Sequence, residues 1–152
     1  MPTPTYTPLA TVTLASTAAS VTFSSIPATY RDLILVVRGT LTSGVGSIRF
    51  NGDSGANYTR VGMYGDGSTA ASYSGTSAEI FNSPITDIMN IMDYSATDKH
   101  KTYIARDSNS ASLVVAQAGR WANTAAITTV ALISPSSTFG VGSTFSLYGV
   151  IA

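Results

Sequence analysis

The sequence predicts an all-β protein, an antiparallel sandwich of two sheets. Lysine and glutamate, which favour helices, are scarce, because the 152 residues include only two lysines and one glutamate, against 21 serines and 21 threonines. Short runs that alternate apolar and polar residues recur about every 8–12 positions, a spacing typical of sandwiches and barrels. These runs predict about nine to eleven strands and no confident helix, and we expect a jelly-roll-like topology.

The N-terminal segment differs from the rest of the chain. Residues 1–8 hold three of the six prolines, at alternate positions. Proline fixes φ and has no N–H to donate to a strand ladder, so we expect residues 1–8 to form an extended arm. Residues 9–152 then form a single domain, the usual number for this length.

The first half of the domain contains five predicted strands, two of them within residues 10–23. The segment 10–23 alternates around a Ser/Thr turn, and 30–40 is apolar on both faces at its centre, which predicts a central strand. Segments 44–50 and 58–64 flank Asn51-Gly52, a pair that tolerates positive φ and so predicts a hairpin between them.

The second half is predicted as strands and one long loop. Residues 65–78 indicate an exposed loop, followed by a short strand at 79–81. The segment 85–94 fits both helical and strand spacing, and we favour strand because its neighbours are strands. The remaining predicted strands are 101–106, 112–120, 126–134 and 144–151.

Charge and cysteine content limit the partners and the chemistry. Eight basic and eight acidic residues cancel, which favours association and provides no field to steer a polyanion, so we expect no nucleic-acid partner. The absence of cysteine excludes disulfides and cysteine–zinc sites. Apolar runs are too short for a membrane helix, and no positive region precedes Arg31, so we expect neither a membrane partner nor a secretory signal.

The titratable residues do not form a recognisable catalytic set. The single histidine, His100, lies between two lysines, and nothing in the sequence pairs it with a serine. Asp87 and Asp93, with other acids as weaker candidates (Asp53, Asp66 and Glu79), could supply a glycosidase carboxylate pair. We interpret His100 as a polar residue at a strand entrance and Arg31–Asp32 as a local ion pair. We therefore predict no catalytic residue, no cofactor and no metal site.

Two alternatives to a purely structural interpretation remain open. Asp53 or Asp66 could bind a cation, although neither lies in an EF-hand pattern. Trp121, with Tyr64 and Tyr73, could stack on a glycan; the competing interpretation places Trp121 in the core or at a subunit interface.

Several segments together resemble small virion structural proteins of tailed bacteriophages, notably those of cyanophages and marine phages. The resemblance covers nearly the whole chain after the arm. It is carried by residues 25–37 (SIPATYRDLILVV), 49–58 (RFNGDSGANY), 93–95 (DYS), 99–102 (KHKT), 119–121 (GRW), 126–130 (AITTV) and 142–149 (GSTFSLYG).

The resemblance implies a non-enzymatic role in assembly. Modules of this kind occur as head decoration (cement) proteins and in tail fibres, so we expect a protein on the capsid exterior that binds the major capsid protein as a homotrimer. The arm would then contact the capsid or a neighbouring subunit through Pro2, Pro4, Tyr6 and Pro8. The alternative is a receptor- or glycan-binding tail module.

Overall fold

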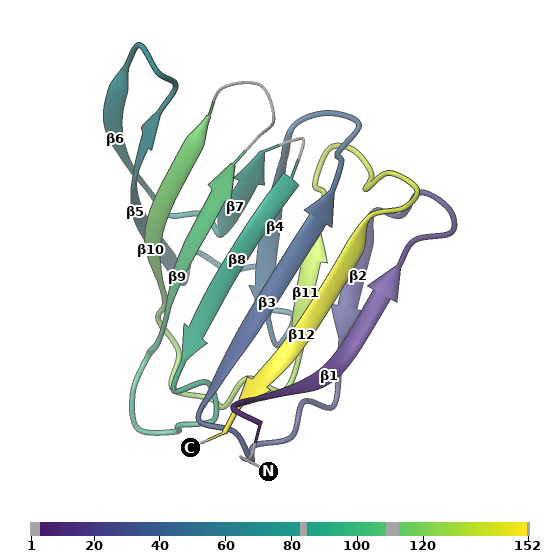
Figure 1. The fold of residues 1–152 in the computed structure, drawn as a ribbon. Coiled ribbons are helices and arrows are strands. Elements are labelled where there is room, and N and C mark those ends of the chain that lie inside the picture. The colour runs from purple at the N-terminus through teal and green to yellow at the C-terminus, as the bar shows by residue number, and fades with distance from the viewer. Residues whose placement is uncertain (1–3, 83–84, 109–112, 152) are drawn as a thin grey trace.

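The computed structural model describes residues 4–82, 85–108 and 113–151 (Figure 1), and the chain forms twelve strands there. Eight strands make one antiparallel sheet, in the order β1 (Tyr6–Thr13), β12 (Thr144–Val150), β3 (Asp32–Gly39), β8 (Ile85–Met92), β9 (Lys101–Ser108), β10 (Val114–Trp121), β5 (Tyr58–Gly65) and β6 (Ala70–Gly75). Four strands make the other, in the order β2 (Ser20–Phe23), β11 (Val130–Ile133), β4 (Val45–Phe50) and β7 (Glu79–Asn82). These ranges contain no helix, and hence none that could span a membrane.

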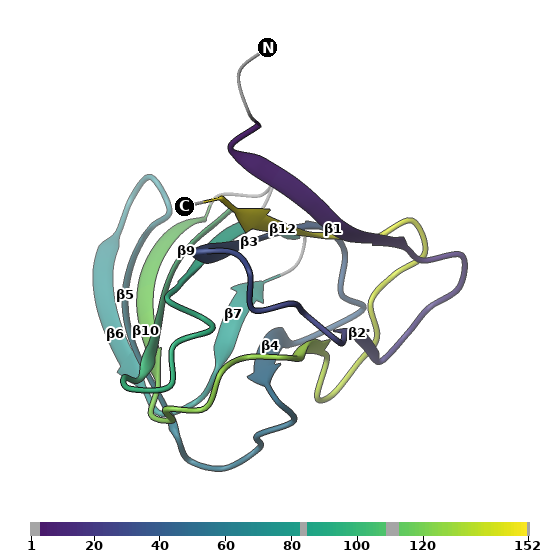
Figure 2. The ribbon, with the colours of Figure 1, turned by 90° about the horizontal axis from the view of Figure 1, so that it is seen from below.

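The two sheets pack face to face, which confirms the predicted sandwich. Figure 2 shows the larger sheet curving around the smaller one, so its inner face is concave and its outer face is convex. Fully buried apolar residues from both sheets fill the space between them, including Leu35, Met89, Ile48, Leu132 and Phe145. The jelly-roll topology is not confirmed, because the strands divide eight and four rather than into two equal sheets.

Strand β3 has the central position that its sequence predicts. It lies between β12 and β8, and Leu33, Leu35 and Val37 on its inner face are 0% exposed. Ile34 and Val36 on its other face are half-buried. Segment 85–94, whose sequence fits both helical and strand spacing, forms strand β8 as far as Met92.

Three local predictions need correction. Residues 70–75, predicted as part of a loop, form β6, which brings the count to twelve strands rather than nine to eleven. The turn at Asn51-Gly52 is present, with φ of 52° and 72°, but it does not close a hairpin. Strand β4 belongs to the small sheet and β5 to the large one, so the chain crosses between sheets after this turn. Strand β11 begins at Val130, later than predicted.

The N-terminal segment enters the large sheet as an edge strand. Tyr6 lies opposite Val150 in β12, and Pro8 lies opposite Tyr148. Pro4, Tyr6 and Pro8 are exposed, whereas Pro2 falls outside the described residues. The second half of the predicted arm is therefore part of the ladder in this structure.

Candidate functional site

Trp121 belongs to the core rather than to a ligand-binding surface. It is 1% exposed, and its ring centroid lies 5.7 Å from that of Phe50. Its indole N–H donates to Oδ2 of Asp53 at 2.7 Å. A buried indole has no free face for a sugar ring, so the glycan contact proposed for Trp121 is wrong and the core interpretation holds.

The other two aromatic residues of that proposed surface also point inward. Tyr73, on β6, is half-buried and donates its hydroxyl hydrogen bond to Oε1 of Gln117 at 3.2 Å. Its ring is also close to the guanidinium of Arg60, whose carbon lies 5.1 Å from the ring centroid. Tyr64 is half-buried on β5, in the register position next to buried Val115. Trp121 therefore cannot offer the open aromatic face that glycan stacking requires, whereas a glycan contact of the half-buried Tyr64 and Tyr73 stays a prediction.

Asp53 organises the turn that links the two sheets. Its carboxylate accepts the Gly55 N–H at 2.8 Å, the Asn57 side-chain amide at 2.9 Å and the Trp121 indole N–H. These donors favour the charged form, the indole most strongly, and so they lower the pKa of Asp53. Tyr58 completes the turn, because its hydroxyl accepts the Phe50 N–H at 3.0 Å and donates to the Asp53 carbonyl at 3.2 Å. Engagement of Asp53 with three protein donors makes it a structural residue.

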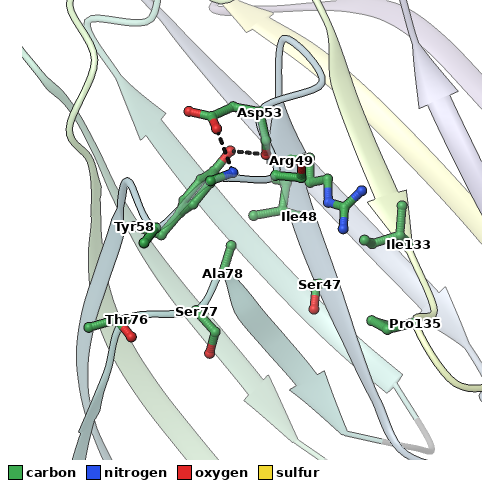
Figure 3. Close-up of a pocket in the computed structure, with 13 residues that line it drawn as sticks. Ser47, Ile48, Arg49, Asp53, Tyr58, Thr76, Ser77, Ala78, Ile133 and Pro135 are labelled. Carbon is green, nitrogen blue, oxygen red and sulfur yellow. Dashed lines mark hydrogen bonds between the residues drawn. The ribbon is translucent and has the colours of Figure 1, made fainter.

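A pocket of about 310 Å³ lies beside this turn (Figure 3). Arg49 and Asp53 contribute opposite charges to its lining, and Ser47, Thr76 and Ser77 contribute hydroxyl groups. Among the lining residues that the structure describes there is no histidine, and the carboxylate of Asp53 is already hydrogen-bonded, so these residues place no free general base beside the hydroxyls. It can hold a small polar molecule, but no reaction is assigned to it.

Asp66 lies in a different turn, between β5 and β6. Its Oδ1 accepts the backbone N–H groups of Ser68 at 2.9 Å and Thr69 at 2.6 Å, and these bonds lower its pKa. Asp53 and Asp66 therefore each stabilise their own turn. Within the described ranges, no group of three or more His, Cys, Asp or Glu residues is placed to hold a metal ion.

The candidate carboxylate pair of Asp87 and Asp93 does not form. Asp87 is buried in β8, whereas Asp93 follows that strand, is exposed and pairs with Lys99 at 3.4 Å. They are six positions apart along a strand and the turn that follows it, a span of about 20 Å, whereas glycosidase carboxyl groups lie about 5–9.5 Å apart. The side chain of Glu79 falls outside the described part of the structure. His100 is exposed in the segment before β9, and Arg31–Asp32 forms the predicted ion pair at 2.7 Å.

Sequence reasoning missed a different acidic pair. Asp107 in β9 lies opposite Asp87 in the register of the large sheet, and the two residues are 7% and 1% exposed. Burial, and then the charge of Asp107, raise the pKa of Asp87 to about 8, while burial raises the pKa of Asp107 to about 6. The alternation of Tyr103, Ala105 and Asp107 was the available signal, because it places Asp107 on the inner face.

The outer face of the large sheet carries an exposed apolar patch. Val61, Met63, Ile104 and Val114 are 48–65% exposed there, and the exposed residues Ala116 and Ala118 lie between them in the register. We call these six residues the outer patch. They line two shallow hollows of about 660 and 720 Å³ together with small residues of β6.

The charged residues at the outward strand positions near the outer patch are all basic. The outward positions of β5, β9 and β10 include Arg106 and Arg120 but no aspartate or glutamate. Exposed apolar side chains beside two arginines make this face the best candidate for contact with another protein.

Comparisons with protein-family models, with curated proteins and with solved structures find no match to this chain.

Proposed function

We propose that the chain is a non-catalytic structural protein of a tailed-phage virion, specifically a head decoration protein. In this role it binds the exterior of the assembled capsid as a homotrimer, with the major capsid protein as its partner. The resemblance of the sequence to small phage virion proteins suggests this class. The outer patch is the structural observation that supports it.

Burial of the outer patch against another protein would be energetically favourable. Complete burial of a Val, Ile or Met side chain contributes roughly 1.5–3 kcal/mol, and four such residues are largely exposed here. Their side chains extend from three neighbouring strands, β9, β10 and β5, so one partner surface can cover them together. A surface this poor in charge also has little electrostatic cost of desolvation.

Stabilisation of the head follows from linkage. A protein that binds the assembled shell, and not its dissociated subunits, shifts the equilibrium towards the shell by an amount set by its affinity and concentration. No active site is needed for this effect. Edge strand β1, with Tyr6 and Pro8 exposed, provides a second surface that can contact the capsid or a neighbouring subunit.

The test compares two valines of equal exposure. Val114 lies in the outer patch and Val141 lies in the loop before β12, and each is 65% exposed. We expect Val114→Ser to lower the number of copies bound to purified heads, and Val141→Ser to leave it unchanged. Equal occupancy for both variants would remove the outer patch from the proposal.

A second measurement addresses location and the arm. A cryo-electron map of the particle should place the chain on the capsid exterior in many copies; a few copies at the tail would favour the receptor-binding alternative. Deletion of residues 2–8 should reduce head occupancy. Unchanged occupancy would withdraw the contact role of Pro2, Pro4, Tyr6 and Pro8.

A further inference from the structure

The large sheet has two open edges, and they differ in how far they permit another strand to pair. Strand β1 carries Pro8, which has no N–H, and its register shifts between Pro8 and Ala10. Proline and bulges are devices that block edge-to-edge association. Strand β6 has neither: its pairing with β5 runs without a shift from Arg60–Gly75 to Gly65–Ala70.

Strand β6 is also held in place by contacts with the rest of the sheet. The Tyr73 ring lies against Gly62 of β5, where an added Cβ would come within 2.5 Å of the ring. The hydroxyl of Tyr73 bonds to Gln117, and Asp66 fixes the preceding turn. An edge that is already ordered loses less conformational entropy when it pairs with a second strand.

We propose that β6 pairs antiparallel with β6 of a second copy of this chain, around a two-fold axis perpendicular to the sheet. Such pairing continues the eight-stranded sheet into one of roughly twice the width and satisfies the outward backbone groups of both edges. Around a two-fold axis, each strand pairs with its own sequence, so a charged residue near the axis would lie close to the same charge of the second copy. Residues 67–78 contain no charged residue.

Side-chain sizes on the outer face fit this arrangement. The outward residues of β6 are small, namely Ala70, Ser72 and Ser74. The larger Val61 and Met63 stand behind them on β5, and a hollow of about 720 Å³ is lined in part by Met63, Ala70 and Ser72. In the pair, the two β5 strands lie about 14 Å apart, three strand spacings, with only small side chains between their apolar residues. The outer patches of the two copies then form one continuous surface.

This inference does not rest on the proposed function. It concerns one edge of the sheet, which is separate from the β1 edge, and it holds whether or not the chain binds a head. Combined with the proposed trimer, the β6 contact would join two trimers into a hexamer. Alone, it produces a dimer.

Sedimentation equilibrium of the full chain tests the contact. In Ser72→Lys/Ser74→Lys, lysines of the two copies lie directly or diagonally opposite each other across the axis, while in the control Thr59→Lys/Thr102→Lys the same charge lies on exposed outer-face positions away from the edge. We expect the first variant to have half the mass of the wild type and the control to keep the full mass. Circular dichroism and the melting temperature verify that both variants are folded.

The possible masses separate this inference from the proposed trimer. A dimer that falls to a monomer supports β6 pairing and contradicts the trimer, and a hexamer that falls to a trimer supports both. A wild-type trimer that the lysines leave unchanged supports the trimer alone and overturns β6 pairing. A wild-type monomer overturns both, and an even-numbered oligomer that the lysines leave intact overturns β6 pairing.

Disulfide trapping provides a second readout, because the chain contains no cysteine. Opposed residues of an antiparallel pair are close enough for a disulfide. We choose two double variants, Ala70→Cys/Ser72→Cys and Ser72→Cys/Ser74→Cys. If the two-fold axis passes beside residue 71, 72 or 73, at least one of them places a cysteine of one copy directly opposite a cysteine of the other. We expect mild oxidation to produce a covalent dimer in at least one of them and none in Val141→Cys. Failure of both double variants to cross-link would overturn the pairing.

Discussion

Asp87 and Asp107 lie opposite each other on neighbouring strands, with both side chains directed into the interior of the sandwich. No hydrogen bond of normal geometry reaches either carboxyl oxygen of Asp87 from the described part of the chain, although the Ile88 N–H slightly favours its charged form. Burial raises the pKa of both carboxyl groups, and the charge of Asp107 raises that of Asp87 further. The pair should therefore be at least partly protonated at neutral pH.

The first prediction is that stability falls as the pH rises. An unfolded aspartate has a pKa of about 3.9, whereas the folded values are about 8 for Asp87 and about 6 for Asp107. Between these values the folded state holds protons that the unfolded state has released, so each group lowers the free energy of unfolding by up to about 1.4 kcal/mol per pH unit. Urea unfolding should show this loss from about pH 4 to pH 8.

The substitution Asp87→Asn removes the titrating group with the higher pKa and keeps its shape. We expect the variant to be more stable than the wild type at pH 8 and to lose less stability above pH 6. Asp66→Asn is the control, because hydrogen bonds lower the pKa of Asp66 and it stays charged throughout this range. A wild-type stability that is flat or rises between pH 5 and pH 8 would show that the pair is ionised.

The second prediction concerns the bond between Trp121 and Asp53. Replacement of Asp53 by Ala leaves the indole N–H of Trp121 without its acceptor, and a bond to a charged acceptor typically contributes about 1.5–3 kcal/mol. We expect a loss of about 2 kcal/mol and a shift of the fluorescence of this single tryptophan. Ser54→Ala, in the same turn, is the control. Unchanged stability and emission in Asp53→Ala would mean that the bond does not form in solution.

Much of the large sheet could be predicted because the hydrophobic pattern within each strand is enough to identify it. Alternation in β9 and β10, and apolar residues on both faces of β3, follow from how a strand is buried. Strand β6 was missed because Ala, Ser and Gly have low strand preference, and only its pairing with β5 and the anchor of Tyr73 make it extended. The Asn51-Gly52 turn was predictable, but turn chemistry does not specify which sheet the next strand joins.

The contacts of the candidate site depend on residues far apart in sequence. Asp53 and Trp121 are 68 positions apart, so their bond could not be read from spacing. The sequence left Trp121 open between core and ligand surface, and only the sheet register resolves this. The outer patch is similar: Val61, Ile104 and Val114 are unremarkable individually and become a patch when β9, β10 and β5 lie side by side.

The third prediction concerns a glycine that makes room for an aromatic ring. Gly119 lies beside Tyr103 in the register, and an added Cβ would come within 2.1 Å of the Tyr103 ring. Because Tyr103 is 1% exposed, its ring cannot move aside freely, and overpacking of this kind typically costs about 1–3 kcal/mol. Gly119→Ala should therefore lower the unfolding midpoint. Gly65→Ala, whose nearest contact is 3.8 Å away, should not; equal effects would show that strand preference alone decides.

The fourth prediction concerns Asn51, which joins its turn to the segment before β11. Its side-chain oxygen accepts the N–H groups of Thr128 at 2.8 Å and Thr129 at 3.1 Å, and its amide donates to the Ala126 carbonyl at 2.7 Å. Asn51→Gly keeps the positive φ while it removes these bonds and a fourth, from the Thr128 hydroxyl at 3.3 Å, so we expect it to cost about 1–3 kcal/mol. Asn51→Ala should cost more, because alanine also resists this φ. Hydrogen exchange of Thr128 and Thr129 should accelerate in both variants, and unchanged protection there would contradict the assigned role of Asn51.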